Sequence, residues 1–215
     1  MKFQTEAELV GTLTNTLRSS FSRDQVQIFK EVSLGFGIAD LVLCNLVDIP
    51  KKRKNKKTCL NFKDINTYSL VDKEECISID EIVSITGCSK IEVKKSLKKL
   101  EKNKYVKIKD SKVYKFKNYS LLFKDNFAIE AKLKDWKRAV QQAYRYRWFA
   151  EYSYVVLDSH YSKSAINNLD IFEKYNVGLA TINPEGNLVR YFNPKRQQPF
   201  DLKMQILFSE KIKNI

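Results

Sequence analysis

Residues 127–133 have the sequence Phe127-Ala128-Ile129-Glu130-Ala131-Lys132-Leu133, in which apolar and polar residues alternate. This alternation predicts a half-buried β-strand. Because side chains on a strand repeat with a period of two, Glu130 and Lys132 point to the same side of the strand. We therefore expect a carboxylate and an ammonium group to share one face of a sheet.

A second strand is predicted upstream, at Ile38-Ala39-Asp40-Leu41-Val42-Leu43-Cys44. Its nearly continuous apolar run predicts burial on both faces. A buried carboxylate is costly unless it is paired, hydrogen-bonded or bound to a metal, so Asp40 needs a partner. If the two strands are neighbours, Asp40, Glu130 and Lys132 converge. Two carboxylates suit a hard divalent cation, and the ammonium suits an anionic nucleophile or a phosphate, which is the chemistry of phosphodiester hydrolysis.

A helix is predicted over residues 6–19, because Thr5 and Glu8 form a capping-box pattern and leucines then recur at helical spacing. Glu6 falls on the same side of this helix as the leucines. Two interpretations of Glu6 stay open. Its carboxylate reaches a metal ion, or it complements the helix dipole at the N-terminus.

Another helix is predicted after Asp135, which is a suitable N-cap residue. Gln142 and Tyr146 are four residues apart and share a stripe of this helix with Arg138. In one interpretation the stripe lines a catalytic cleft. Gln142 then orients a phosphate or a water, and Arg138 and Tyr146 bind nucleic acid, the tyrosine by stacking on a base. In the other interpretation, the stripe is the rim of an ordinary amphipathic helix.

These residues resemble the PD-(D/E)xK nuclease superfamily, which includes restriction endonucleases, archaeal Holliday-junction resolvases and RecB-type nucleases. Asp40 resembles the motif aspartate, and Glu130-Ala131-Lys132 resembles the E-x-K motif. Glu6-Ala7-Glu8-Leu9 is similar to the E-x-E-L start of the resolvases, in which the first glutamate joins the metal site. Gln142 and Tyr146 resemble the Q-x-x-x-Y motif of the RecB-type enzymes.

The resemblance covers residues 1–48 and 119–192 and differs from the family pattern twice. Ala39 stands before Asp40, where the family usually has a proline, and the gap between Asp40 and Glu130 is far longer than usual. The long gap requires an insertion. Strands predicted over 154–157, 177–182 and 188–192 and a helix over 164–175 complete an α/β order.

The resemblance implies a restriction-endonuclease-like mixed sheet flanked by helices. It also implies a site in which Asp40, Glu130 and the Ala131 carbonyl bind Mg²⁺, with Mn²⁺ as a substitute and Glu6 as a further ligand. Lys132 then positions or stabilises the attacking hydroxide. Asp40, Glu130, Lys132 and Gln142 are therefore the predicted catalytic residues.

The formal net charge of +14 predicts a polyanionic partner, either nucleic acid or an acidic membrane surface. Residues 51–117 carry 20 Lys and Arg against 9 Asp and Glu, an excess of 11, so the middle of the chain holds most of the charge. No apolar run approaches the roughly 18 to 20 residues that span a bilayer, which predicts no membrane segment. The N-terminus lacks a signal-peptide pattern, which predicts a cytoplasmic protein.

A basic linker is predicted over residues 49–73. It contains a run of cations that is either a solvated loop or a sequence-independent phosphate clamp, and the two interpretations are compatible. The residues expected to bind nucleic acid there are Lys51, Lys52, Arg53 and Lys54.

A separate domain is predicted over residues 74–118, and residues 119–215 are predicted to return to the nuclease core. Ser78 with Glu81, and Ser89 with Glu92, form capping boxes ahead of two short helices, and a hairpin follows over 105–116. Helix, turn, helix and hairpin resemble a winged helix-turn-helix domain. Five lysines of the second helix are predicted to meet phosphates or the major groove: Lys90, Lys94, Lys95, Lys98 and Lys99.

Lysine is a point charge, and no arginine or asparagine is placed for bidentate base reading, so we expect more affinity than specificity from this helix. The alternative is a solvated helix face in a domain that makes protein contacts or dimerises.

The whole sequence predicts a Mg²⁺-dependent DNA endonuclease that grips duplex DNA. The rival prediction is a winged-helix DNA-binding regulator on an inactive nuclease-like scaffold. Double-strand cleavage needs two sites, which a homodimer would supply.

Overall fold

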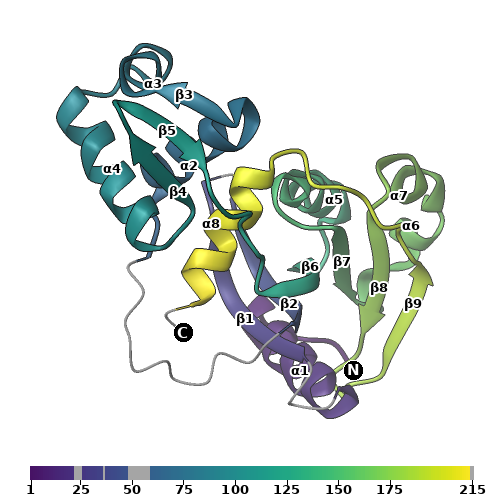
Figure 1. Ribbon diagram of the computed structural model, residues 1–215. Helices are drawn as coiled ribbons and strands as arrows, with labels where there is room; N and C mark the ends of the chain where they lie inside the picture. The colour runs from purple at the N-terminus through teal and green to yellow at the C-terminus, as the bar shows by residue number, and fades with distance from the viewer. Residues whose placement is uncertain (22–25, 36, 48–58, 214–215) are drawn as a thin grey trace. The chain divides into compact units, whose positions relative to one another are not determined.

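The computed structural model describes residues 1–21, 26–35, 37–47 and 59–213. The chain divides into two compact units (Figure 1). The first, here called the sheet unit, contains residues 1–49 and 122–201. The second, here called the inserted unit, contains residues 50–121 and 202–215. The chain therefore passes from the sheet unit to the inserted unit after residue 49, returns at residue 122, and passes to the inserted unit again after residue 201.

The sheet unit is built on six strands in the spatial order β1-β2-β6-β7-β8-β9. Three neighbouring strands, β6, β7 and β8, are parallel, whereas β1, β2 and β9 run antiparallel to their neighbours. The predicted α/β class with a mixed sheet is thus confirmed. The strands are β1 (Val26–Ser33), β2 (Ile38–Leu46), β6 (Phe123–Lys132), β7 (Tyr152–Asp158), β8 (Gly178–Ile182) and β9 (Leu188–Phe192).

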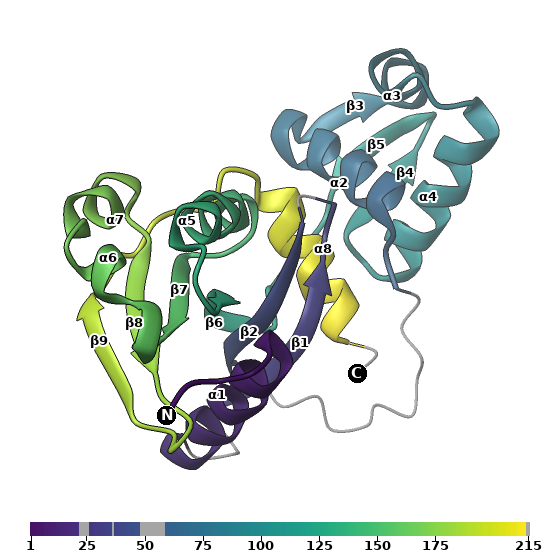
Figure 2. The same cartoon turned by 180° about the vertical axis from the view of Figure 1, so that it is seen from behind.

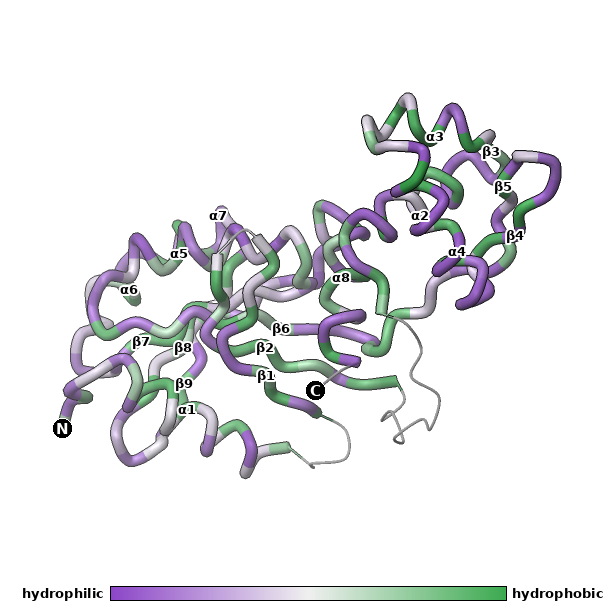
Figure 3. The backbone as a smooth tube through the Cα atoms, turned by 90° about the vertical axis from the view of Figure 1, so that its left-hand side faces the viewer, coloured by the Kyte–Doolittle hydropathy of each residue, from purple (hydrophilic) through white to green (hydrophobic). Residues whose placement is uncertain are grey.

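Helix α1 (Glu6–Ser20) covers one face of this sheet, and α5 (Trp136–Arg145) lies on the other (Figure 3). The apolar face of α1, formed by Leu9, Leu13 and Leu17, packs on a cluster from β2, β6, β7 and β8. Two shorter helices, α6 (Lys163–Ile166) and α7 (Leu169–Tyr175), replace the single helix predicted over 164–175. Asn168 between them has a non-helical backbone, and its side chain bonds the carbonyl of Ser164 at 2.8 Å, which ends α6.

The N-terminal segment is fixed to the sheet by a buried aspartate at the end of β7. Asp158 is fully buried, and its carboxylate accepts hydrogen bonds from the backbone N–H of Phe3 at 3.0 Å and of His160 at 2.9 Å. Helix α1 then begins with the predicted capping box, in which Glu8 N–H donates to Thr5 Oγ1 at 3.1 Å. These contacts set where the first turn of α1 lies relative to the end of β6.

Strand β6 was predicted to be half-buried, and this prediction is wrong. It is a central strand of the sheet, with β2 on one side and β7 on the other, and helices cover both faces. Ala128, Glu130 and Ala131 are all buried. The polar residues that suggested a solvent-facing side instead point into the interior of the unit. The burial of the Glu130 carboxylate is therefore costly unless the group is paired, hydrogen-bonded or protonated.

The inserted unit combines four helices with a three-stranded sheet in the order β3-β5-β4 (Figure 2). The two predicted helices and the hairpin are present, and both predicted capping boxes form. The hairpin turns at Asp110 and Ser111, which both have positive φ, as a tight two-residue turn requires. The elements are α2 (Phe62–Glu74), β3 (Cys76–Ser78), α3 (Ile79–Thr86), α4 (Lys90–Lys102), β4 (Val106–Lys109), β5 (Lys112–Lys115) and α8 (Leu202–Ile212).

The boundaries of this unit differ from the predicted ones at both ends. Part of the predicted linker 49–73 forms α2, which starts with a capping box between Asn61 and Asp64. The end of the predicted nuclease core forms α8, whose Ile206 joins the apolar cluster of the inserted unit. Glu210 of α8 is buried there, where it accepts hydrogen bonds from the Leu60 N–H at 2.9 Å and the Tyr119 hydroxyl at 2.7 Å.

One buried carboxylate joins α2 to α4. Asp64 is 2% exposed and accepts hydrogen bonds from Ser96 Oγ at 2.6 Å, Lys99 Nζ at 2.7 Å and the Asn61 N–H at 2.9 Å. A buried carboxylate with three donors is satisfied, and removing it leaves those donors without their acceptor. By contrast, the ion pair between Lys63 and Glu92 at 2.6 Å is exposed.

We predict that Asp64→Ala destabilises the inserted unit by about 2–4 kcal/mol, because it removes a helix cap and a buried ion pair together. Lys63→Ala, at the exposed pair on the same helix, should cost less than about 1 kcal/mol. Native-state hydrogen exchange of the amides of α2 and α4 measures both effects. Equal losses of protection in the two variants would contradict the account of Asp64.

Candidate active site

The register of β2 and β6 brings the predicted site residues to the same place on the sheet. The two strands are antiparallel neighbours, and Leu41 lies opposite Ile129. Asp40 therefore lies level with Glu130, at the end of the pairing. Its Oδ2 accepts a hydrogen bond from the Ala131 N–H at 2.7 Å. Asp40 thus has the partner that its position in a buried strand requires.

Glu130 and Lys132 lie on the same side of β6, and their side chains meet. Lys132 Nζ is 3.1 Å from Glu130 Oε1 and 3.0 Å from Glu6 Oε2. Glu130 is 1% exposed, so its negative charge depends on these contacts. Glu6 reaches Lys132 from the first turn of α1, so one carboxylate both contacts the site and lies at the positive end of a helix.

Tyr146 contacts the same carboxylate from the opposite direction. Its hydroxyl donates to the Ile38 carbonyl at 2.7 Å and forms a short hydrogen bond with Glu130 Oε2. The ring is 2% exposed, so it cannot stack on a base, and the prediction of Tyr146 as a nucleic-acid contact is wrong. Gly37 lies beside the ring with φ +118°, a conformation that favours glycine at this close approach.

The hydroxyl of Tyr146 has one proton and faces two acceptors, the Ile38 carbonyl and Glu130. Both contacts are satisfied together when Glu130 carries a proton of its own. Burial raises the pKa of Glu130, and the charge of Asp40 raises it further, while the hydrogen bonds from Tyr146 and Lys132 oppose this shift. Burial and the charge of Asp40 therefore favour the protonated form of Glu130 relative to that of an exposed glutamate.

The other two charged groups are shifted by the same neighbours. Burial raises the pKa of Asp40 against the lowering effects of the Ala131 N–H and of Lys132, and Glu6 adds to the rise. Burial acts to lower the pKa of Lys132, but its hydrogen bonds with Glu6 and Glu130 outweigh burial, so the net shift is upward. Lys132 is thus held as a cation between carboxylates that repel one another.

Glu31 is a fourth carboxylate that the sequence could not assign to the site. In the β1–β2 pairing Lys30 lies opposite Leu41 and Val32 opposite Ala39, so Glu31 lies opposite Asp40. Its charge contributes to the raised pKa of Asp40. Glu31 has φ +52°, a left-handed conformation that costs a non-glycine residue about 1–2 kcal/mol. The hairpin pattern was visible in the sequence, but this strained conformation was not.

Gln142 lies one helical turn before Tyr146 on α5. Its Oε1 is buried and has no hydrogen-bond partner among the described residues. A buried polar atom without a partner is unusual and is often explained by a bound water or ligand. Gln142 therefore has an acceptor available for a water, and its role in orienting one at the site stays a prediction. Arg138, a further turn back, is exposed.

The donor set fits a hard divalent cation by its chemistry, since it offers two carboxylates and a backbone carbonyl. Each oxygen of Glu130 already has one hydrogen-bond partner, Lys132 on Oε1 and Tyr146 on Oε2, but each keeps a lone pair. Among the described residues, no group of three or more His, Cys, Asp or Glu is arranged to hold a metal ion. The predicted cation ligands, Asp40, Glu130 and the Ala131 carbonyl, therefore stay a prediction.

The lysines predicted on α4 fall into two groups. Lys99 is half-buried in its ion pair with Asp64, so its prediction as a nucleic-acid contact is wrong, because it stabilises the α2–α4 contact. Lys90 donates to Asp80 at 2.7 Å in an exposed pair. Lys94, Lys95 and Lys98 are exposed. Four further predicted contacts lie outside the described residues: Lys51, Lys52, Arg53 and Lys54.

Comparison of this chain with protein-family profiles, with curated proteins and with solved structures finds no match in any of the three. In the described part of the chain, every helix is too short or too polar to cross a bilayer. We therefore infer a function for this chain from the positions of Asp40, Glu130 and Lys132.

We predict that Glu130→Gln raises the melting temperature at neutral pH in EDTA, because it removes a buried charge while the amide oxygen accepts from Lys132 and the amide NH₂ donates to the Tyr146 hydroxyl, which itself donates to the Ile38 carbonyl. The folded pKa of Glu130 lies above its unfolded value, so the folded state binds the proton more tightly. Wild-type stability therefore falls as the pH rises from about 4.3 through the raised pKa. The melting temperatures of the wild type and the variant, measured at intervals between pH 4 and pH 8, give the difference in stability at each pH.

The advantage of Glu130→Gln should vanish below the unfolded pKa, where both side chains are neutral. The exposed Glu185 of the same unit provides the matched control, and Glu185→Gln should change the melting temperature little at any pH. A Glu130→Gln variant that is less stable than the wild type across the whole range would show that the ionised carboxylate is the favoured form.

Proposed function

We propose that this chain is a metal-dependent DNA endonuclease of the PD-(D/E)xK type, which hydrolyses phosphodiester bonds. The observation that carries the proposal is the convergence of three chemically matched side chains. The Asp40 carboxylate bonds the backbone of Ala131 at 2.7 Å, and Lys132 Nζ lies 3.1 Å from Glu130. A buried acid, with a second acid and a cation that are partly buried beside it, is costly to fold and useful for phosphoryl chemistry.

Asp40, Glu130 and the Ala131 carbonyl would hold Mg²⁺, or Mn²⁺ in its place, with Glu6 as a weaker candidate. The bound ion supplies polarisation of the scissile phosphate and a lower pKa for the attacking water. In this reaction the water oxygen bonds to phosphorus, and the bond from phosphorus to the leaving oxygen of the sugar breaks. The water loses one proton to solvent, and the leaving oxygen takes one proton from solvent.

Lys132 has an electrostatic role in the proposed reaction. Its pKa is raised, so the side chain keeps its proton and is unsuited to act as a general base near neutral pH. As a cation it positions the attacking hydroxide and stabilises the negative charge that develops on the phosphate. Tyr146 holds Glu130 in place through its hydroxyl, and Gln142 offers an acceptor that orients the water.

The inserted unit is proposed to be a winged helix-turn-helix domain that grips duplex DNA. The element order of helix, strand, helix, helix and hairpin supports this, as does the pairing of β3 with the hairpin strand β5. In this arrangement α4 is the recognition helix and presents Lys94, Lys95 and Lys98. The hairpin carries exposed lysines at Lys107, Lys109 and Lys112. Cleavage of both strands needs two sites, which a homodimer would provide.

A second candidate function is a DNA-binding regulator in which the nuclease-like sheet is only a scaffold. One observation favours it. Both Glu130 oxygens have partners within the chain, Lys132 and Tyr146, so the carboxyl group needs no metal to satisfy it. The two candidates agree on DNA binding by the inserted unit and differ on hydrolysis.

A plasmid-nicking assay distinguishes them. We predict that the wild type nicks supercoiled DNA with Mg²⁺ or Mn²⁺ and not with EDTA. Lys132→Ala should lower the rate by about 100-fold or more, as expected for the loss of an electrostatic group at the reacting phosphate. Lys124→Ala is the matched control, because Lys124 is an exposed lysine on the same strand, and its rate should equal that of the wild type.

Circular dichroism of both variants would check that Lys132→Ala keeps the fold. Mg²⁺-dependent nicking by a folded Lys132→Ala at the wild-type rate would refute the assigned role of Lys132. Tight, salt-sensitive DNA binding by a wild type that never cleaves would favour the regulator.

A further inference from the structure

Ile91 is exposed to an unusual degree for a large apolar side chain. It is 81% exposed, more than any other large apolar side chain of the described residues except Met1. It lies in the first turn of α4, opposite the buried face formed by Val93, Leu97 and Leu100. A well-packed helix gains nothing from an isoleucine there, so the residue is better explained by a partner than by folding.

The surroundings of Ile91 are basic. Lys94, Lys95 and Lys98 follow it by three, four and seven residues, so all three share its side of the helix, and all are exposed. Lys90, directly before it, is paired with Asp80 at 2.7 Å. A lone apolar group inside a ring of ammonium groups is poorly matched to an apolar protein groove and well matched to a polyanion that carries methyl groups.

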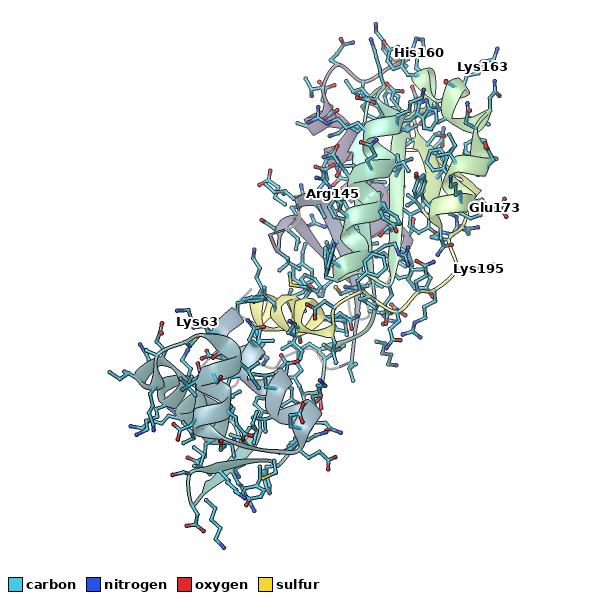
Figure 4. All side chains as sticks on the ribbon, turned by 90° about the horizontal axis from the view of Figure 1, so that it is seen from above. Lys63, Arg145, His160, Lys163, Glu173 and Lys195 are labelled. Carbon is cyan, nitrogen blue, oxygen red and sulfur yellow. The ribbon has the colours of Figure 1, made fainter. Side chains whose placement is uncertain are left out.

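Glu92, the acidic residue in the first turn of α4, is paired away from the helix face that carries Ile91. Glu92 accepts from Ser89 in the capping box and pairs at 2.6 Å with Lys63 of α2, which is labelled in Figure 4. The hydrogen bonds from Lys63 and Ser89 lower the pKa of Glu92 to about 2. Its charge is therefore compensated by α2 and the helix terminus, and the side that carries Ile91 stays positive.

We propose that Ile91 contacts the C5-methyl groups of thymine in the major groove and makes α4 prefer A·T-containing duplex DNA. This inference rests on the proposed binding of duplex DNA by the inserted unit. The N-terminal residues of a recognition helix are those that reach base edges, and the thymine methyl is the apolar group exposed there. The lysines supply affinity without reading sequence, and Ile91 adds discrimination that needs no hydrogen bond.

The test compares two duplexes that differ only in the methyl group. Poly(dA-dT) and poly(dA-dU) are used as competitors for the full chain in EDTA, so that cleavage does not interfere. The wild type should bind poly(dA-dT) about fourfold more tightly, the change expected for one buried methyl-sized group. Ile91→Ala should bind both duplexes equally, with the affinity of the wild type for poly(dA-dU).

Two matched controls separate this effect from the charge. Ile85→Ala removes another exposed isoleucine, 60% exposed on α3, and should keep the preference for thymine. Lys95→Ala should weaken binding to both duplexes alike and make the salt dependence less steep by about one phosphate contact. Both substitutions lie on exposed positions, so the fold is expected to be retained.

The outcomes are distinct. A preference for thymine that survives Ile91→Ala, or a wild type that binds both duplexes equally, would overturn the role of Ile91 while leaving the proposed duplex binding intact. Failure of the wild type to bind either duplex at low salt would overturn duplex binding itself, and the inference with it. Loss of the preference in Ile91→Ala alone supports the contact.

Discussion

The burial of the Glu130 carboxylate is the constraint on which the rest of the sheet unit depends. A carboxylate that is 1% exposed in a central strand must be neutralised, protonated or bound. The fold supplies Lys132 from the same strand and Tyr146 from the position directly after α5, while Asp40 of the neighbouring strand lies close enough to oppose the charge of Glu130. Lys132 offsets part of the repulsion between the two carboxylates, and the proposed divalent cation would offset the rest.

Much of this arrangement followed from local rules. The period of two put Glu130 and Lys132 on one side, and the capping boxes of α1, α3 and α4 formed as predicted. What failed depended on tertiary placement. Tyr146 was expected to face a base, but it packs beneath the β1–β2 hairpin, and Glu31 joined the site only through the strand register. No pattern within one segment reports such contacts.

In the inserted unit too, the features set by neighbouring residues could be predicted, and those set by tertiary contacts could not. Lysines on α4 are alike in sequence, yet Lys99 is tied to the buried Asp64 while Lys94, Lys95 and Lys98 stay exposed. Helix α2 was missed because the linker predicted from the basic run was extended to residue 73, although Ile65, Tyr68 and Val71 recur at helical spacing. Its presence changes the interpretation of the unit, since it provides the acid that holds Lys99 and the lysine that compensates Glu92.

The central claim is that Asp40 and Glu130 jointly hold one divalent cation. Titration of the chain with Mn²⁺, followed by the electron paramagnetic resonance signal of the free ion, tests it without substrate. The account predicts one site in the wild type, weakened at least about tenfold in both Asp40→Asn and Glu130→Gln and unchanged in Glu185→Gln. Equal Mn²⁺ affinity in the wild type and both site variants would contradict it.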